Sequence, residues 1–323
     1  MKNVLVTGGL GFIGSNFILK YLKSGYNIIN VDCKTYASVD SKLLNFNSYE
    51  NYKHYDIDIT NFNDINNIII KYSFDKIIHF AAESHVDNSI NNSSVFANTN
   101  VLGTINLLEA YKNLKNKNKL FLHISTDEVY GSIIGGKFDE LSPYKPNSPY
   151  AASKASSDHF VKSYYKTHKL PVIITNCSNN FGKYQHKEKF IPTIISSLIY
   201  RQKIPIYGDG KNIREWIYVD DHIDALIYLI EFGRIGESYC IGSGYEYSNL
   251  EIVKKSCDIY DELVKSKSSK ELISFVEDRK GHDFRYALNS SKIKNLGWKS
   301  KYNFEESLSK TLEWYLSNKN FLS

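Results

Sequence analysis

The sequence predicts an α/β protein with a doubly wound parallel sheet and a smaller C-terminal lobe. Two observations support this fold class. Short apolar strands alternate with helical stretches through the first 180 residues, and a glycine-rich turn follows the first strand directly. Apolar strands without polar alternation are typical of a parallel sheet that helices cover on both faces.

The individual elements follow from apolar runs and helical periodicity. Strands are expected at 3–7, 28–32, 76–81, 120–125 and 172–176. Helices are expected at about 15–23, 62–72, 93–113 and 150–168. After residue 180, proline and glycine punctuate shorter elements, which indicates a second lobe. We therefore expect one domain at 1–178 plus about 217–242, and a second domain at 179–216 plus 243–323.

Composition excludes several classes of protein. The 323 residues are 42% hydrophobic, and no apolar run approaches the roughly 18 residues of a membrane span. A strand pattern begins at residue 3, so we expect no signal peptide. Four scattered cysteines without a Cys-x-x-Cys spacing argue against disulfides or zinc and favour the cytoplasm. The net charge of +5 comes with no basic stripe interleaved with aromatics, so no nucleic-acid partner is expected.

The turn after the first strand predicts a dinucleotide site. Gly8, Gly11 and Gly14 form Gly-x-x-Gly-x-x-Gly between a strand and a helix, where a tight turn lets the backbone approach a pyrophosphate. Asp32 closes the second strand, where a carboxylate accepts hydrogen bonds from ribose hydroxyls and disfavours NADP. Lys34 weakens this preference for NAD. The alternatives are a purely structural turn and an aspartate that only caps a loop.

Two further segments belong to the expected cofactor site. Asp58 is a candidate partner for the adenine amine. The small residues at 80–84, which include Ala81, Ala82 and Ser84, would let the backbone lie beside a cofactor. His79, Glu83 and His85 could be taken for metal ligands, but no helical His-x-x-x-His face exists, so no metal is expected.

Two groups of residues predict proton-transfer chemistry. Tyr150 and Lys154 are four residues apart and share one helix face. A neighbouring cation can help to lower the tyrosine pKa by the roughly three units, about 4 kcal/mol, that a base at neutral pH requires. Thr126, Asp127 and Glu128 follow a strand and add an acid and a second base. The alternative for Asp127 and Glu128 is an exposed acidic turn.

With these motifs the sequence resembles the extended short-chain dehydrogenases/reductases, which have an NAD-binding Rossmann fold. Within them it resembles the nucleotide-sugar 4,6-dehydratases, and the dTDP-glucose-specific branch most of all. The resemblance covers nearly the whole chain. It rests on TGGLGFIGSNF, VDCKTYAS, HFAAESHVDNSI, ISTDEVYG, SPYAASKASSDHFV, NCSNNFGKYQ, PIYGDGKNIREWIYVDDH and DRKGHDFRY.

The resemblance implies an NAD-dependent hydro-lyase that forms a 4-keto-6-deoxyglucose nucleotide, with dTDP-glucose favoured and UDP-glucose second. Tyr150 would deprotonate the C4 hydroxyl, with Lys154 tuning it. Glu128 would remove the C5 proton, Asp127 would protonate the departing C6 hydroxyl, and Thr126 would bind near O4. A nucleotide-sugar 4-epimerase, which needs neither Asp127 nor Glu128, and a non-catalytic NAD-binding regulatory protein remain the alternatives.

The resemblance also implies further contacts and a homodimer that pairs through helices such as those at 93–113 and 150–168. Additional cofactor contacts would come from Phe12, Ile13, Thr35, Ile59, Thr99 and Asn180, with Tyr150 and Lys154. The nucleotide sugar, whose diphosphate attracts arginine and lysine, would contact Ser84, His85, Thr126, Asn179, Glu188, Lys189, Arg214, Asn249, Arg279 and His282.

Overall fold

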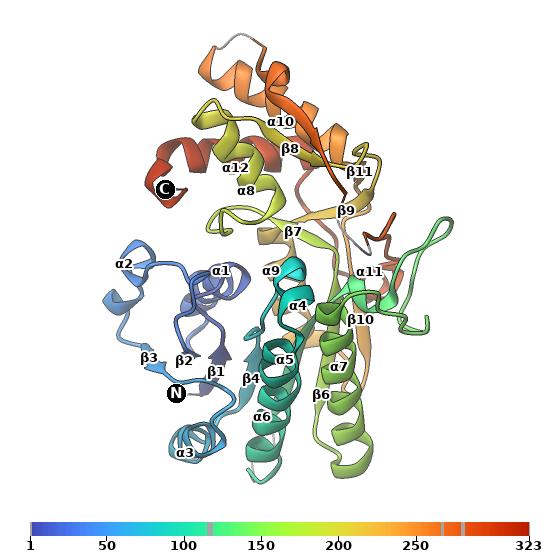
Figure 1. Ribbon diagram of the computed structural model, residues 1–323. Coiled ribbons are helices and arrows are strands. Elements are labelled where there is room, and N and C mark those ends of the chain that lie inside the picture. Colours follow the sequence, from blue (N-terminus) through green and yellow to red (C-terminus); the bar gives the residue numbers. More distant parts are fainter. Residues whose placement is uncertain (1, 115–118, 266–267, 279–281, 323) are drawn as a thin grey trace.

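The computed structural model describes residues 2–114, 119–265, 268–278 and 282–322 (Figure 1). Its largest sheet has seven strands in the order β10-β6-β5-β4-β1-β2-β3, and every neighbouring pair is parallel. The strands are β1 (Asn3–Thr7), β2 (Asn27–Asp32), β3 (Tyr52–Asp56), β4 (Lys76–His79), β5 (Leu120–Thr126), β6 (Val172–Cys177) and β10 (Ser238–Ile241). The predicted doubly wound parallel sheet is confirmed.

Helices cover both faces of this sheet because its strands are apolar on both sides. Along β1, Leu5 packs into one buried cluster, whereas Val4 and Val6 pack into another. The first cluster lies under α3 (Phe62–Tyr72), α6 (Gly103–Lys112) and α7 (Pro149–His168). The second lies under α1 (Phe12–Tyr21) and α9 (Val219–Phe232). Alternation of side chains along each strand therefore divides the core between two helical layers.

Two elements differ from the sequence expectations. The strand β3 (Tyr52–Asp56) was not expected, because its half-exposed edge position permits a polar sequence. The helix expected at 93–113 consists of α5 (Ser93–Phe96), a π-helical segment (Ala97–Leu102) and α6. The amide of Asn100 in the π-helical segment bonds the backbone of Glu83 and the Ser153 hydroxyl. This segment therefore joins the loop after β4 to α7.

The second lobe contains two small sheets. One has the order β11-β9-β7, and the other pairs β8 with β12. The strands are β7 (Asn179–Phe181), β8 (Ile204–Tyr207), β9 (Ile213–Tyr218), β11 (Glu246–Ser248) and β12 (Ile273–Val276). The remaining helices are α2 (Ser41–Leu44), α4 (Val86–Asn91), α8 (Phe190–Ile199), α10 (Asn249–Val264), α11 (Ser291–Leu296) and α12 (Phe304–Ser317). Single 3-10 turns occupy Leu22–Ser24, Phe46–Ser48, Asp127–Tyr130, Ser269–Leu272 and Lys319–Phe321.

The lobe sits over the end of the large sheet at which the strands finish (Figure 1). Between its two parts the chain returns to the large sheet through α9 and β10, and β10 pairs with β6. In the described part of the chain, no helix is long and apolar enough to cross a membrane.

Candidate active site

A cavity of about 490 Å³ opens at the carboxyl ends of the sheet strands. Strands β2 and β3 lie in sequence on one side of β1, and β4 then pairs with the opposite side of β1. Ligands of doubly wound sheets bind at such a switch in strand order. The segments that follow six strands, β1 to β6, all contribute to the cavity wall, together with part of residues 185–189 from the second lobe.

The glycine turn after β1 forms one wall of the cavity. Gly8 has φ +71°, and a Cβ there would lie 2.6 Å from the Ala81 nitrogen. A Cβ on Gly14 would lie 2.2 Å from the Gly8 carbonyl oxygen. Gly11 caps the N-terminus of α1, and its N–H donates to the Gly8 carbonyl at 3.1 Å. The turn thus brings free N–H groups of a helix N-terminus to the cavity, which is the arrangement that binds a pyrophosphate.

Gly14→Ala is expected to weaken NAD binding by about tenfold or more, because a clash with the Gly8 carbonyl moves the turn and 1.4 kcal/mol corresponds to about tenfold. Calorimetric titration of NAD measures the change. Gly135→Ala is the matched control, since a Cβ at Gly135 meets no atom within 4 Å and its φ is not in the left-handed region. Equal affinities of the two variants would contradict the role of the turn.

Asp32 lies at the end of β2, where it caps a loop and also lines the cavity. Its carboxylate accepts hydrogen bonds from the N–H groups of Leu10 and Lys34, both at 2.9 Å. The residue is 8% exposed and lies at the part of the cavity where the adenosine of a dinucleotide is expected. The Lys34 ammonium pairs with Asp56 at 3.0 Å and does not line the cavity.

Most of the predicted cofactor residues meet at this cavity. Besides Gly8, Gly11, Gly14 and Asp32, the cavity wall contains Phe12, Ile13, Thr35, Asp58, Ile59, Ala81, Ala82, Ser84, Thr99, Tyr150, Lys154 and Asn180. The glycine cradle, the helix N-terminus and the acid after β2 therefore fit a dinucleotide.

The acidic pair lies at the other end of the cavity, directly after β5. Thr126 caps the short 3-10 turn Asp127–Tyr130, and its hydroxyl accepts the Glu128 N–H at 3.2 Å. The same hydroxyl donates to Asp127 Oδ1 at 3.3 Å. Thr126, Asp127 and Glu128 all line the cavity, and Asp127 is only 2% exposed. The pair is therefore part of an internal site and not an exposed acidic turn.

The surroundings of Asp127 favour its protonated form. Burial raises the pKa of its carboxyl well above the usual value, and the nearby charges of Glu128 and Glu215 raise this pKa further. Asp127 Oδ2 has no hydrogen-bond partner among the described residues. A neutral carboxylic acid with an oxygen free to meet a ligand is the state that a general acid requires.

Asp127→Asn is expected to stabilise the folded protein at pH 7. A pKa raised by folding gives stability that is complete below the unfolded pKa and is lost as pH rises toward the folded pKa. Asparagine keeps the neutral form, so the melting temperature at pH 7 should rise by about 2 °C or more. The gain over wild type should vanish near about pH 3, where the acid is protonated in both states. A lower melting temperature at pH 7 would contradict the burial argument.

Tyr150 and Lys154 lie on the first turns of α7. Ser148 caps this helix through the Ala151 N–H, and Pro149 follows the cap. Burial and the charge of Glu128 raise the pKa of Tyr150 well above its usual value, whereas a hydrogen bond with Thr126 lowers it. The Lys154 ammonium donates to the Ile124 carbonyl at 2.8 Å. Without a bound cofactor, the site therefore holds Tyr150 as a neutral phenol.

The predicted substrate residues fall into two groups. Ser84, Asn179, Glu188 and Lys189 line the cavity, and the Lys189 ammonium donates to the Ser84 carbonyl at 2.8 Å. His85, Arg214, Asn249 and His282 do not line it, and Arg279 lies outside the described residues.

Arg214 is engaged with the second lobe itself. Its guanidinium donates to the carbonyl oxygens of Ile213 and Asp283, both at 2.8 Å, and stacks on the Tyr286 ring with the centroid 4.3 Å away. The neighbouring Arg285 pairs with Glu246 at 2.7 Å. These contacts hold residues 283–286 against β9 and β11.

The other three residues outside the cavity wall have local roles. The His85 ring accepts the Asn88 N–H and caps α4. The His282 ring contacts the Asp278 carboxylate at 2.7 Å. Asn249 begins α10, and its N–H donates to the Asn212 carbonyl.

Sequence reasoning missed several residues of the cavity wall. Most of them follow strand ends or flank residues that were identified, so the carboxyl-end rule for parallel strands would have found many of them. They are Val31, Cys33, Ala37, Ser38, Ile57, Val95, Ile124, Ser125, Cys177, Ser178, Gln185 and His186.

The sheet and its cavity define a dinucleotide-binding α/β protein with a buried acid pair. The family model described as GDP-mannose 4,6 dehydratase matches residues 5–311. The chain therefore belongs to the GDP-mannose 4,6-dehydratase family. It is 47% identical to a dTDP-glucose 4,6-dehydratase of Haemophilus influenzae, over 98% of this chain and 99% of that protein. The predicted resemblance to nucleotide-sugar 4,6-dehydratases is confirmed.

Solved structures agree with this assignment. The dTDP-glucose 4,6-dehydratase DesIV from Streptomyces venezuelae, solved with NAD bound, superposes with a TM-score of 0.92 at 40% identity, covering 99% of this chain and 98% of that chain. A UDP-glucose 4-epimerase from Thermotoga maritima superposes with a TM-score of 0.88 at only 26% identity, covering 98% and 99%. The epimerase shares the fold but is a more distant relative.

Proposed function

We propose that this protein is an NAD-dependent hydro-lyase that converts dTDP-glucose to its 4-keto-6-deoxyglucose nucleotide. The observation that carries this function is the buried Asp127 beside Glu128, in the same cavity as Tyr150 and the glycine turn. A 4-epimerase uses a tyrosine base but has no step that requires such an acid pair. Dehydration requires both an acid and a second base.

The first step needs a base at the C4 hydroxyl of the sugar. Tyr150 removes this proton, and Thr126, which lies within hydrogen-bond reach of Tyr150, binds the same oxygen. NAD, held by the glycine turn, Asp32 and Lys154, would supply the acceptor for the C4 hydride and the donor of that hydride to C6. Because burial disfavours the phenolate, Lys154 and the cofactor's positive charge must offset that penalty before Tyr150 can act.

Elimination follows from the ketone that the first step leaves at C4. A C5–H bond beside a carbonyl is acidic, so Glu128 removes that proton as the enolate forms. Asp127 gives its proton to the C6 hydroxyl, which leaves as water. Glu128 finally returns a proton to C5. Burial raises the pKa of Asp127 and so favours the protonated form with which the elimination starts.

The two domains bind different ligands in this proposal. We assign residues 1–178 and about 217–242 to NAD binding, and residues 179–216 and 243–323 to the nucleotide sugar. Ser84, Asn179, Glu188 and Lys189 hold the end of the substrate that lies in the cavity. Arg214, Asn249 and His282 belong to the nucleotide end, which lies beyond the cavity wall described above.

The test incubates the purified protein with NAD and, separately, dTDP-glucose or UDP-glucose, with mass spectrometry to detect loss of one water. Substrate deuterated at C4 should give product with deuterium in the C6 methyl group, because the hydride is returned within one active site. We expect dTDP-glucose to be converted more efficiently than UDP-glucose. A product of unchanged mass with inverted C4 would identify an epimerase instead.

A homodimer is part of the proposal. Large apolar side chains on one helical face are partly exposed, with Leu102 at 45% and Phe160 at 40%. Ile90 is 45% exposed. These three side chains come from α4, the π-helical segment and α7, and the first two elements both pack against α7. Burying such a face against its own copy gives a two-fold dimer.

Leu102→Glu is expected to convert the dimer to a monomer, because a charge at the centre of an apolar contact is not compensated. Light scattering coupled to size-exclusion chromatography measures the mass. Ile70→Glu on α3, where the side chain is 62% exposed, is the control and should leave the mass unchanged. A wild-type monomer would overturn the proposed assembly.

The proposed compartment is the cytoplasm. All four cysteines are free thiols, and three of them are buried. A reducing environment suits this arrangement.

A further inference from the structure

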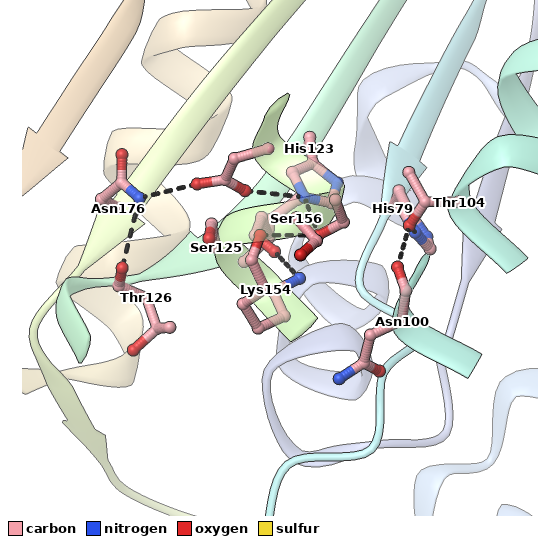
Figure 2. A network of polar contacts seen from close by, with 12 residues as sticks. His79, Asn100, Thr104, His123, Ser125, Thr126, Lys154, Ser156 and Asn176 are labelled. Carbon is pink, nitrogen blue, oxygen red and sulfur yellow. Dashed lines mark hydrogen bonds and ion pairs between the residues drawn. The ribbon is translucent and has the colours of Figure 1, made fainter. Parts of the chain in front are cut away.

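A buried polar cluster lies beneath the catalytic residues, between α7 and the strands β5 and β6 (Figure 2). Asp158 is fully buried at its centre. Its carboxylate contacts His123 Nε2 at 3.1 Å and accepts hydrogen bonds from the Tyr144 hydroxyl at 2.8 Å and the Asn176 amide at 3.2 Å. The reaction proposed above gives none of these side chains a chemical step.

The cluster reaches the active site by two routes. The first is Asn176, whose amide nitrogen also donates to the Thr126 carbonyl at 3.2 Å (Figure 2). The second is α7, on which Asp158 lies one turn after Lys154, so that both side chains share one face. Lys154 is only 4% exposed. A buried ammonium and a buried carboxylate thus lie one helical turn apart, in a medium where charges interact strongly.

We propose that Asp158 is a positioning residue of this site: it supplies the counter-charge that keeps Lys154 protonated and, through Asn176, holds the end of β5 that carries Thr126. The link to catalysis rests on the proposed function, but the charge pairing does not.

The other groups around Lys154 do not supply this charge. His123 on β5 and His79 on β4 are buried, and burial and the Lys154 charge lower their pKa values, that of His123 to about 4. Burial raises the pKa of Cys177 on β6 to about 12. Tyr150 on α7 is a neutral phenol. At neutral pH these groups are uncharged.

The state of the Asp158–Lys154 pair agrees with the proposal. Burial opposes ionisation of Asp158, but its hydrogen bonds with His123 and Tyr144 and the charge of Lys154 outweigh burial and lower the pKa of Asp158. Burial lowers the pKa of Lys154, and Asp158 opposes that change. Removing the carboxylate would therefore leave an isolated ammonium in the interior, which costs more than losing the pair together.

A double-mutant cycle tests the pairing without reference to activity. Asp158→Asn and Lys154→Met each leave one buried charge, and the combined variant leaves neither. We expect the melting temperature of the combined variant to fall by less than the sum of the two single losses. If Asp158→Asn does not fold, recovery of folding in the combined variant gives the same answer. Additive losses would overturn the proposal.

A pH series separates a charge effect from simple loss of packing. In Asp158→Asn the pKa of Lys154 falls further below its usual 10.5. The stability deficit relative to wild type should therefore be largest near about pH 7 and shrink toward about pH 10, as Lys154 loses its proton in both folded proteins. A deficit that stays constant across this range would overturn the proposed counter-charge.

Turnover connects the pair to the reaction. At pH 7, Asp158→Asn should lower kcat by about tenfold or more, since a charge within reach shifts a pKa by about one unit or more. Tyr144→Phe is the control, because it removes a hydrogen bond to the same carboxylate but keeps the charge, and its kcat should change less. If the two stabilities are coupled but Lys154→Met keeps the wild-type kcat, the proposed catalytic role of Lys154 is wrong. The charge pairing is still supported in that case. Wild-type kcat in Asp158→Asn, with Lys154→Met inactive, would overturn the positioning role.

Discussion

Asp127→Asn combined with Glu128→Gln is expected to abolish water elimination and to leave C4 oxidation in place. Elimination needs a base at C5 and an acid at C6, and the double variant supplies neither. Oxidation at C4 depends on Tyr150, which the substitutions leave unchanged. Each lost proton transfer slows a reaction by about 10²- to 10⁴-fold, so dehydration should fall below detection.

The measurement is a single turnover of the NAD-loaded enzyme with dTDP-glucose. Reduced nicotinamide should appear and persist, while mass spectrometry finds no loss of water. The control changes another adjacent acid pair, Asp139→Asn with Glu140→Gln, which does not line the cavity. Full dehydration by the Asp127/Glu128 variant would contradict the assigned roles, whatever the control does.

Tyr150→Phe is expected to stop the reaction one step earlier. Phenylalanine fills nearly the same space but cannot accept the C4 hydroxyl proton, so hydride transfer should slow by about 10²- to 10⁴-fold. In the wild type, oxidation should speed up as pH rises through the Tyr150 pKa in the complex, because the phenolate is the base. In Tyr150→Phe, this increase of the oxidation rate with pH should be absent.

The same single-turnover experiment distinguishes the two variants. Tyr150→Phe should form neither reduced nicotinamide nor dehydrated product, whereas the acid-pair variant forms the first. Tyr164→Phe is a matched control on the same helix, since Tyr164 and Tyr150 are both 9% exposed. Rapid appearance of reduced nicotinamide in Tyr150→Phe would show that another group is the base.

The sequence was most informative where function depends on short spacings. The glycine turn, Asp32 and the Tyr150–Lys154 pair each lie within one local element, so their relative placement follows from strand and helix geometry. The polar edge strand β3 was missed because its sequence lacks a buried apolar pattern. The interruption of the helix at 97–102 was missed because it depends on Asn100 contacts with Glu83 and Ser153, which are distant in sequence.

The contacts of the predicted substrate residues also depend on segments that are distant in the sequence. Lys189 reaches the cavity because the second lobe folds back over Ser84, 105 residues earlier in the chain. Arg214 also donates to the carbonyl groups of Asp283 and Phe284, and nothing in its motif reveals these contacts with a distant segment.

The amino-acid sequence by itself determined the fold class, the dinucleotide turn and the identity of the acid pair, because each follows from local patterns of apolar, small and ionisable residues. Only the tertiary structure decided the burial of Asp127, Lys154 and Asp158, and the link from Asp158 through Asn176 to Thr126. Both depend on removal of charge from water and on contacts between distant strands, and a linear pattern encodes neither quantity directly.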